Sequence, residues 1–243
     1  MKRTFDFTAS LIGLLVLSPL LVVLCVLVWL QDRHSPFYIP NRVGRGEKPY
    51  RMIKLRSMLV RADTNKVDST ANNDPRITVI GRIIRRCKFD EIPQLWNVLV
   101  GDMSLVGPRP NVQRETDLYT SEEKRLLSVR PGITDISSIV FADEGSILEG
   151  KPDPDLAYNQ LIRPYKSRLG LLYVEHAGVV LDVRLILLTL LSAMNRRAAL
   201  GHVSSIVAKL GASRELITVA LRQAPLQPAP PPGSTEIVTS RGI

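Results

Sequence analysis

Residues 88–110 of this chain read KFDEIPQLWNVLVGDMSLVGPRP. They place two adjacent carboxylates, Asp90 and Glu91, just ahead of Pro93, a residue that readily opens a helix. An anionic nucleophile or metal ligand, a helix N-terminus and the basic residues just upstream are what chemistry on a phosphate group needs. Neighbours on a regular helix point about 100° apart, so the two carboxylates are not expected to be equivalent. An isolated pair of this kind can also be an ordinary helix cap.

Other basic residues offer contacts for a phosphate group. Arg109 stands between two prolines, which restrict the backbone on both sides and pre-organise its guanidinium for a bidentate phosphate contact. For Arg109 alone, a surface turn is the other interpretation. Lys54 and Arg56 are two residues apart on an expected strand and so share one face of it. They form either part of a phosphate cradle or a solvated edge.

The composition limits the kind of partner. The 243 residues carry a formal net charge of +9, and residues 41–130 hold 18 Lys and Arg against 11 Asp and Glu. Such a surface attracts nucleic acid, anionic lipid headgroups or phosphorylated small molecules, and charge alone does not choose among them. The sequence has no glycine-rich nucleotide-binding motif and no zinc-finger or basic-zipper pattern. The histidines are scattered and the two cysteines form no framework, which argues against a zinc site and fits a cytosolic location.

An uncharged stretch of twenty residues, 11–30, is long enough to cross a bilayer core of roughly 30 Å as a straight helix. A spanning helix would put residues 31–243 on the far side of the membrane from the basic N-terminus, against the positive-inside tendency. Ser18 and Pro19 lie near the middle and favour a broken, re-entrant helix. Proline removes a backbone donor, and Ser18 can bond the freed carbonyl. A proline-kinked helix that spans the bilayer is the alternative.

Local patterns predict short elements in the rest of the chain. Residues 37–39 and 50–55 flank a glycine-rich turn and predict a β-hairpin, and the polar stretch 61–74 predicts a mobile loop. The other expected elements are helices at 77–86, 120–127 and 158–171, a turn at 130–134 and a polar loop at 143–154. A further helix is expected to begin at Pro93, and its buried side is expected to carry Leu95, Trp96, Val98 and Leu99.

The C-terminal part is expected to be helical and then disordered. Residues 181–194 predict an apolar helix that either fills the core or lies in a membrane interface. Residues 203–222 show a milder amphipathic pattern. After residue 223 the composition shifts to Pro, Gly, Ser and Thr, which predicts a disordered tail.

Taken together, these blocks resemble the bacterial sugar transferase family, the monotopic polyprenyl-phosphate phosphoglycosyl transferases. The resemblance covers roughly residues 1–195 in the expected order. It is carried by Lys2-Arg3-x-Phe5-Asp6, Ser18-Pro19, Arg42-Val43-Gly44, Lys54-Leu55-Arg56-Ser57-Met58, the segments 73–78, 90–98 and 101–110, Arg130-Pro131-Gly132-Ile133-Thr134 and the segment 181–188.

The resemblance implies an enzyme that moves a sugar phosphate from a UDP-sugar to polyprenyl phosphate and releases UMP. Asp90 would attack the sugar-bearing phosphate and form a phosphoryl-aspartate intermediate. Glu91 would help to bind Mg²⁺, which neutralises charge on the diphosphate. Phosphate oxygens would be bound by Arg109, Arg76, Arg85 and Arg130, with Lys54 and Arg56 as further candidates from the strand.

The expected fold is α/β and mostly helical. It comprises a re-entrant membrane helix at residues 1–34, a compact cytosolic catalytic domain at 35–197 with a short β-hairpin and interfacial amphipathic helices, an amphipathic helix at 198–222 and a disordered tail at 223–243. The implied location is the bacterial inner membrane, with the catalytic domain facing the cytoplasm. The implied partners are membrane lipid, the two substrates, a second copy of the chain and downstream glycosyltransferases of exopolysaccharide, capsule or lipopolysaccharide synthesis, and no nucleic acid.

The chain departs from the family pattern directly after Thr134. Residues 135–141 read DISSIVF, where other members continue with Gly-Trp. This region is expected to help select the sugar or the nucleotide. Two other classes compete with the enzyme: a catalytically silent, membrane-anchored partner of an assembly machine, and a basic protein that binds nucleic acid beside the membrane. The intact acidic pair and Arg109 argue against the first, and the lack of a recognition motif argues against the second.

Overall fold

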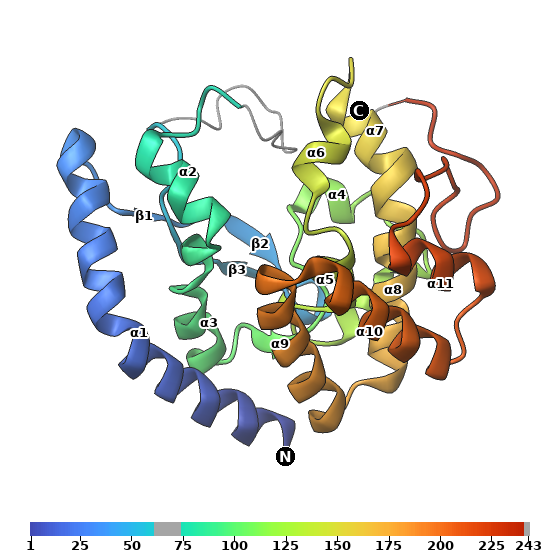
Figure 1. Cartoon of the computed structure of the whole chain (residues 1–243), viewed down its shortest axis with the longest axis horizontal. Coiled ribbons are helices and arrows are strands. Elements are labelled where there is room, and N and C mark those ends of the chain that lie inside the picture. Colours follow the sequence, from blue (N-terminus) through green and yellow to red (C-terminus); the bar gives the residue numbers. More distant parts are fainter. Residues whose placement is uncertain (61–73, 241–243) are drawn as a thin grey trace.

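A computed structural model describes residues 1–60 and 74–240 of the chain (Figure 1). The mobile loop predicted for residues 61–74 lies outside these ranges except for its last residue. Most of the described chain is helical, which confirms the predicted class. The α-helices are α1 Lys2–Asp32, α2 Val79–Arg86, α3 Gln94–Val100, α4 Gln113–Thr116, α5 Ile136–Val140, α6 Glu144–Leu148, α7 Pro154–Ala157, α8 Arg163–His176, α9 Val179–Met194, α10 Arg196–Lys209 and α11 Arg214–Leu221.

Shorter helical turns and strands connect these helices. The 3₁₀ turns are η1 Arg45–Glu47, η3 Phe89–Glu91 and η4 Glu123–Ser128, and η5 Tyr158–Ile162 is a π-helical turn. The predicted hairpin is confirmed: β2 Asn41–Val43 pairs antiparallel with β3 Pro49–Arg51, and β1 Phe37–Tyr38 pairs with β4 Lys54–Leu55. The helices expected at 77–86, 158–171 and 181–194 are present as α2, η5 with α8, and α9.

A parallel strand pair replaces the turn expected at 130–134. β5 Ser104–Val106 pairs with β6 Gly132–Thr134. The two backbones approach so closely that a Cβ on Gly132 would lie 2.0 Å from the backbone nitrogen of Gly107. Only glycine fits there. In the sequence, a glycine that is required by a close contact with a distant strand looks the same as a glycine that is required by a turn.

The main apolar core lies among α5, α8, α9, α10 and α11. Ile136, Leu169, Leu185 and Val203 contribute fully buried side chains from four of these helices. The prediction of one amphipathic helix over residues 198–222 is therefore wrong. The segment forms two helices, α10 and α11, and both pack into this core. They are separated at Gly211, whose φ of +84° favours glycine.

Two smaller predictions also fail. The stretch predicted as a polar loop at 143–154 contains α6, which is held to the core by the buried Leu148. One apolar residue among polar neighbours gives too little periodicity to reveal a short helix. The helix expected at 120–127 is the 3₁₀ turn η4, where Thr120 and Glu123 each accept the other's backbone N–H.

α1 is continuous, and it bends near its middle instead of breaking (Figure 1). Pro19 has no N–H to donate to the carbonyl of Leu15, and Ser18 Oγ donates to that carbonyl at 2.9 Å. The predicted role of Ser18 is thus confirmed. Among the described residues, α1 is the one helix long and apolar enough to cross a membrane, and few of its apolar side chains are buried against the body.

Polar contacts join the beginning of α1 to the body. Lys2 Nζ lies 2.5 Å from Oδ2 of Asp182, a fully buried residue of α9. The buried carboxylate of Asp6 accepts a hydrogen bond of 2.9 Å from Ser104 Oγ in β5. Arg3 donates to two backbone carbonyls of α3. Buried polar groups are costly to leave unpaired, so these contacts fix the first turns of α1 to the domain.

The end of α1 is bound to the same body. Asp32 accepts two hydrogen bonds from the guanidinium of Arg56, the residue directly after β4. Arg56 Nε also donates to the carbonyl of Ser35 at 2.8 Å, which holds the guanidinium in place. The guanidinium lowers the pKa of the Asp32 carboxyl. Leu24 and Val28 pack nearby in a small apolar cluster with β4 and α2.

The segment predicted to be a disordered tail lies against the body as far as residue 240. Its carbonyls accept hydrogen bonds from α8: Tyr165 Oη donates to Gln227 at 3.0 Å, and Arg168 Nη2 donates to Pro230 at 2.9 Å. The side chain of Ala229 is buried in the main core. A proline-rich segment loses little conformational entropy when it is held extended, so a few such contacts order it.

Replacing Ala229 by arginine tests this packing. The large charged side chain has no room in the core, and overpacking of this kind costs about 1–3 kcal/mol. We expect the melting temperature to fall by roughly 2–12 °C, measured by thermal denaturation in detergent. Ala224→Arg, at an exposed position of the same tail, is the matched control and should leave the melting temperature unchanged. Equal melting temperatures for the two variants would contradict the packed tail.

Candidate active site

The acidic pair lies in the 3₁₀ turn η3, one turn ahead of α3. Lys88, directly before the turn, has a φ of 55° and separates α2 from the turn. Pro93 is the N-cap of α3, as predicted, so Asp90 and Glu91 precede the helix and are not in its first turn. The sequence predicts a carboxylate pair at the start of a helix. The pair does lie beside the start of α3, but it belongs to the preceding 3₁₀ turn and not to the helix.

The buried side of α3 differs from the predicted one. Gln94, Asn97 and Val98 are buried, whereas the Trp96 side chain is 51% exposed. Asn97 accepts a hydrogen bond from the backbone nitrogen of Ile53 at 2.9 Å and donates to a neighbouring carbonyl of β3. These two bonds fix the hairpin against α3. They place β4, and with it Lys54, directly opposite the acidic pair.

Lys54 is shared by both carboxylates. Its Nζ lies 3.7 Å from Asp90 Oδ2 and 3.7 Å from Glu91 Oε1. Both acidic side chains therefore turn toward one point, although they are neighbours in sequence. What distinguishes them is Arg109, whose Nη2 donates to Glu91 Oε1 at 3.0 Å.

The charges around the pair push the two carboxyl pKa values apart. Burial opposes ionisation of Glu91, but the positive charges of Arg109, Lys54 and Lys88 outweigh it and lower the pKa of Glu91 to about 2. Burial raises the pKa of Asp90, and Lys54 offsets this only in part while the Glu91 charge adds to it. Glu91 is thus a firmly ionised carboxylate, and Asp90 is the more basic of the two.

The donor set suits a magnesium ion that is completed by substrate. Mg²⁺ in proteins is commonly bound through one or two carboxylates together with substrate phosphates and water. Asp90 and Glu91 supply hard oxygen donors that already converge on a cation, Lys54. Within the described ranges no cluster of three or more His, Cys, Asp or Glu side chains is present. The residues fit Mg²⁺ in the substrate-completed form, in which Glu91 would be the protein ligand.

The other predicted phosphate contacts divide into two groups. Arg85, in the last turn of α2, lies near enough to Asp90 for its positive charge to offset part of the rise in the pKa of Asp90. Arg76 instead pairs with Asp74 at 2.6 Å, and Arg130 Nε donates to the carbonyl of Gly101 at 2.7 Å. For Arg76 and Arg130, phosphate binding stays a prediction.

Arg56 is not part of the site. Its guanidinium is buried and bound to Asp32 at the end of α1. The expectation that it shares a face with Lys54 assumes a regular strand, but β4 ends at Leu55. Arg56 therefore anchors α1, and of these two residues only Lys54 faces the acidic pair.

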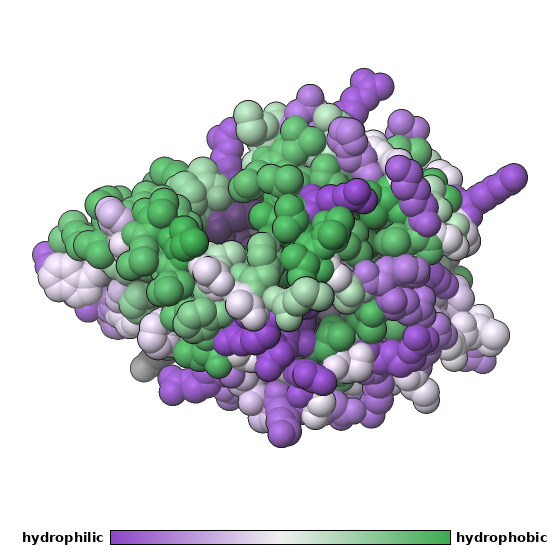
Figure 2. Space-filling model, turned by 90° about the horizontal axis from the view of Figure 1, so that it is seen from below, coloured by the Kyte–Doolittle hydropathy of each residue, from purple (hydrophilic) through white to green (hydrophobic). Residues whose placement is uncertain are grey.

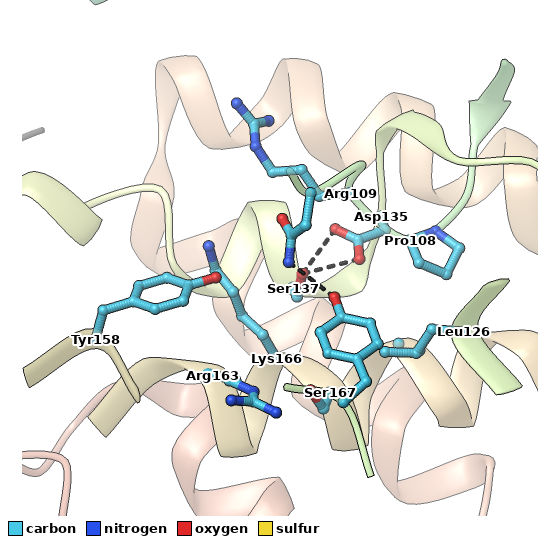
Figure 3. A pocket seen from close by; sticks show the side chains of 12 residues that line it. Pro108, Arg109, Leu126, Asp135, Ser137, Tyr158, Arg163, Lys166 and Ser167 are labelled. Atoms are coloured by element: carbon cyan, nitrogen blue, oxygen red, sulfur yellow. Dashed lines mark hydrogen bonds between the residues drawn. The ribbon is translucent and has the colours of Figure 1, made fainter. Parts of the chain in front are cut away.

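A polar pocket lies beside Arg109, and no single sequence motif predicts it. Arg109, Asp135, Ser137, Tyr158 and Lys166 are among its lining residues. They come from the loop after β5, the start of α5, and η5 with α8, as Figure 3 shows. The unusual sequence after Thr134 pointed to two of them. No local signal joins Tyr158 and Lys166 to the acidic pair, because only the fold brings these segments together.

Comparison with known proteins places these features in one family. The model of the family described as bacterial sugar transferase matches residues 1–196. The match begins at α1 and contains the hairpin, the acidic pair, Arg109 and α9. It ends at the start of α10, so most of α10, α11 and the tail lie outside it.

Curated relatives share this region. The undecaprenyl-phosphate galactose phosphotransferase of Salmonella typhimurium is 41% identical in an alignment of 150 positions, which covers 55% of this chain and 31% of the relative. The undecaprenyl-phosphate glucose phosphotransferase of Komagataeibacter xylinus is 36% identical over 196 residues, 78% of this chain and 35% of the relative. The galactosyl transferase CpsE of Streptococcus agalactiae is 36% identical over 200 residues, 78% and 41% of the two chains. The chain spans less than half the length of these relatives. With its family match over residues 1–196, it belongs to the bacterial sugar transferase family.

Proposed function

We propose that this protein transfers a sugar phosphate from a UDP-sugar to polyprenyl phosphate and releases UMP. The observation that carries the proposal is the acidic pair held between Lys54 and Arg109, since this arrangement combines a carboxylate nucleophile with two cations for a diphosphate. The names of relatives support the acceptor, because two of them act on undecaprenyl phosphate and a galactose or glucose phosphate.

The reaction proceeds in two displacements at one phosphorus atom. An oxygen of the Asp90 carboxylate attacks the phosphorus that bears the sugar, and the bond from that phosphorus to UMP breaks. The sugar phosphate is then joined to Asp90 as an acyl phosphate. An oxygen of polyprenyl phosphate next attacks the same phosphorus, which forms polyprenyl diphosphate sugar and frees the carboxylate.

The environment of each carboxylate supports this division of roles. Asp90 has the raised pKa and is therefore the more basic and more nucleophilic carboxylate, although it must be ionised to react. Glu91 is held ionised by Arg109 and Lys54 and suits a cation. Glu91 would hold Mg²⁺, which would supply positive charge to the diphosphate and the leaving group. Arg109, Lys54 and Arg85 orient the phosphate oxygens around Asp90.

A broad apolar surface supports work on a lipid substrate. Figure 2 shows hydrophobic side chains gathered on one face, bordered by polar ones. Apart from the apolar side chains of α1, the exposed members include one face of α9: Val180, Val183, Leu187, Leu190 and Met194. The other face of α9 packs into the core. We propose that this surface rests in the cytoplasmic leaflet of the inner membrane, with the catalytic body in the cytoplasm.

We also propose that α1 enters and leaves the membrane by the same face. Its first turn is tied to Asp182 and its last turn to Arg56, and both partners belong to one body. A helix that crossed the bilayer would separate its ends by roughly 30 Å of hydrocarbon. The bend at Pro19 allows the middle of α1 to dip into the leaflet while both ends stay with the domain.

Cysteine labelling in spheroplasts tests this topology. In a Cys25→Ala background, the exposed Cys87 reports on the body, and His34→Cys in a Cys25→Ala/Cys87→Ala background reports on the end of α1. We expect both thiols to resist a membrane-impermeant maleimide added outside and to react after permeabilisation. Labelling of residue 34 from outside would show that α1 spans the membrane.

The activity itself is tested with a panel of UDP-sugars in detergent or nanodiscs. We expect UMP release from at least one donor, with turnover that depends on polyprenyl phosphate and on Mg²⁺. A protein that releases UMP from none of them is not the proposed enzyme. The sugar moved, the glycan that it initiates, the second copy of the chain and the downstream glycosyltransferases stay predictions.

A further inference from the structure

The pocket beside Arg109 is an open, polar hollow in the body. Its free space is about 400 Å³ when the open solvent at its mouth is counted. Pro108 and Arg109 form one side, the start of α5 another, and η5 with α8 a third (Figure 3).

The wall from α5 presents a fixed polar edge. The Asp135 carboxylate is 1% exposed and caps α5 by accepting the backbone N–H of Ser138 at 2.6 Å. It also accepts the hydroxyl proton of Ser137 at 2.8 Å. Because the proton of Ser137 is committed to Asp135, its oxygen can only accept from a ligand.

The opposite wall offers groups that can donate. Tyr158 and Lys166 extend toward the pocket from η5 and α8 in Figure 3. Lys166 is paired with Glu144, and its Nζ lies 5.2 Å from the centre of the Tyr158 ring. Within the part of the chain that the structure describes, the Tyr158 hydroxyl makes no hydrogen bond, so it is available to donate or accept.

The lining favours a sugar ring over a nucleobase. A base commonly stacks on an open aromatic face, and here a cation already lies over each nearby ring: Lys166 over Tyr158, and Arg163 at 5.5 Å from the centre of Tyr119. Sugar hydroxyls both donate and accept, which matches the acceptor Ser137 on one wall and the hydroxyl of Tyr158 on the other.

Arg109 links the pocket to the reacting phosphorus. Its side chain lines the pocket and also donates to Glu91 in the acidic pair. A group in the pocket and the phosphate that Asp90 attacks would therefore both lie beside Arg109. In the donor, the sugar is attached directly to that phosphate.

We infer that this pocket holds the sugar ring of the nucleotide-sugar donor, and that Ser137 and Tyr158 select the sugar by contacting its hydroxyl groups. The inference rests on the proposed function and deepens it, because it assigns substrate selection to two residues that act away from the phosphate. Asp135 is a positioning residue that holds Ser137.

Donor selectivity in Tyr158→Phe and Ser137→Ala tests the inference. Each change removes a single hydroxyl. Ser138→Ala, next along α5 and outside the pocket lining, is the matched control. For each variant, kcat/KM is measured across the UDP-sugar panel, and the inhibition constant of UMP, which lacks the sugar, is measured beside it.

We expect the ratio of kcat/KM between the preferred donor and its next competitor to fall about tenfold or more in both pocket variants, because a site that bonds a hydroxyl discriminates strongly against its absence. The UMP inhibition constant and the control should stay within about twofold of wild type. An unchanged ratio with normal turnover overturns the pocket assignment alone. A rise in the UMP inhibition constant equal to the loss in kcat/KM would show that the pocket holds the nucleoside. If the wild-type protein turns over no donor, the proposed function fails, and the inference fails with it.

Discussion

Asp90→Asn is expected to abolish UMP release, with a loss of at least about 10³-fold. An amide of nearly the same size lacks the negative oxygen that the proposed attack on phosphorus requires, and removal of a covalent nucleophile has effects of this order or larger. Lys54 keeps Glu91 as a partner in the variant, so the fold should be retained. The measurement is the steady-state rate with the best UDP-sugar and polyprenyl phosphate, together with the melting temperature.

The control for this variant removes the same charge elsewhere. Asp117→Asn lies in an exposed position after α4 and should retain the wild-type rate. A rate for Asp90→Asn within tenfold of wild type would mean that Asp90 is not the nucleophile, whatever the role of Glu91.

Glu123→Gln is expected to lower the free energy of unfolding by about 3–5 kcal/mol. Glu123 is fully buried and accepts two hydrogen bonds from Arg163, of 3.1 and 2.6 Å, and one from Ser167 of 2.7 Å. The neutral amide leaves the Arg163 charge buried without its partner, which is much costlier than losing a surface ion pair. A fall of this size corresponds to roughly 6–20 °C in melting temperature.

The neighbouring residue provides the comparison. Glu122→Gln changes the same chemical group at an exposed position and should shift the melting temperature by no more than a degree or two. The double variant Glu123→Gln/Arg163→Met should recover part of the loss, because it removes the unpaired charge. If Glu123→Gln and Glu122→Gln melt alike, the buried pair does not stabilise the fold.

The sequence predicted those features that are encoded by residues close together. Asp90, Glu91 and Pro93 form a local motif, and the structure keeps them together in one turn before α3. Ser18 was expected to bond the carbonyl freed by Pro19, and it does. The strands of the hairpin also have a local cause, the glycine-rich turn between them.

Features that depend on distant partners were missed or misplaced. The convergence of Lys54 on the acidic pair relies on Asn97, which bonds the backbone of the hairpin from 44 residues away. Arg56 was expected beside Lys54, but its partner is Asp32 in α1. Composition predicted disorder for the tail, whereas Arg168 binds its backbone from 62 residues away. Periodicity and composition contain no information about such pairings.

The exposed Trp96 shows a further limit. Apolar side chains on a short helix are normally assigned to the buried face. In this fold, Asn97 is buried because it bonds the hairpin, Gln94 is buried on the same side of α3, and Trp96 is left outside. An apolar surface of this kind is expected where a protein meets a membrane, so the usual rule of polar outside and apolar inside does not apply there.

The proposed covalent role of Asp90 is tested most directly in the absence of acceptor. Protein mixed with a UDP-sugar and Mg²⁺, without polyprenyl phosphate, should release UMP in a burst of up to one equivalent per active site. Its intact mass should rise by that of the sugar phosphate, on the peptide that contains Asp90, and addition of polyprenyl phosphate should discharge it. No UMP before acceptor is added, or a mass increase on another peptide, would contradict the account.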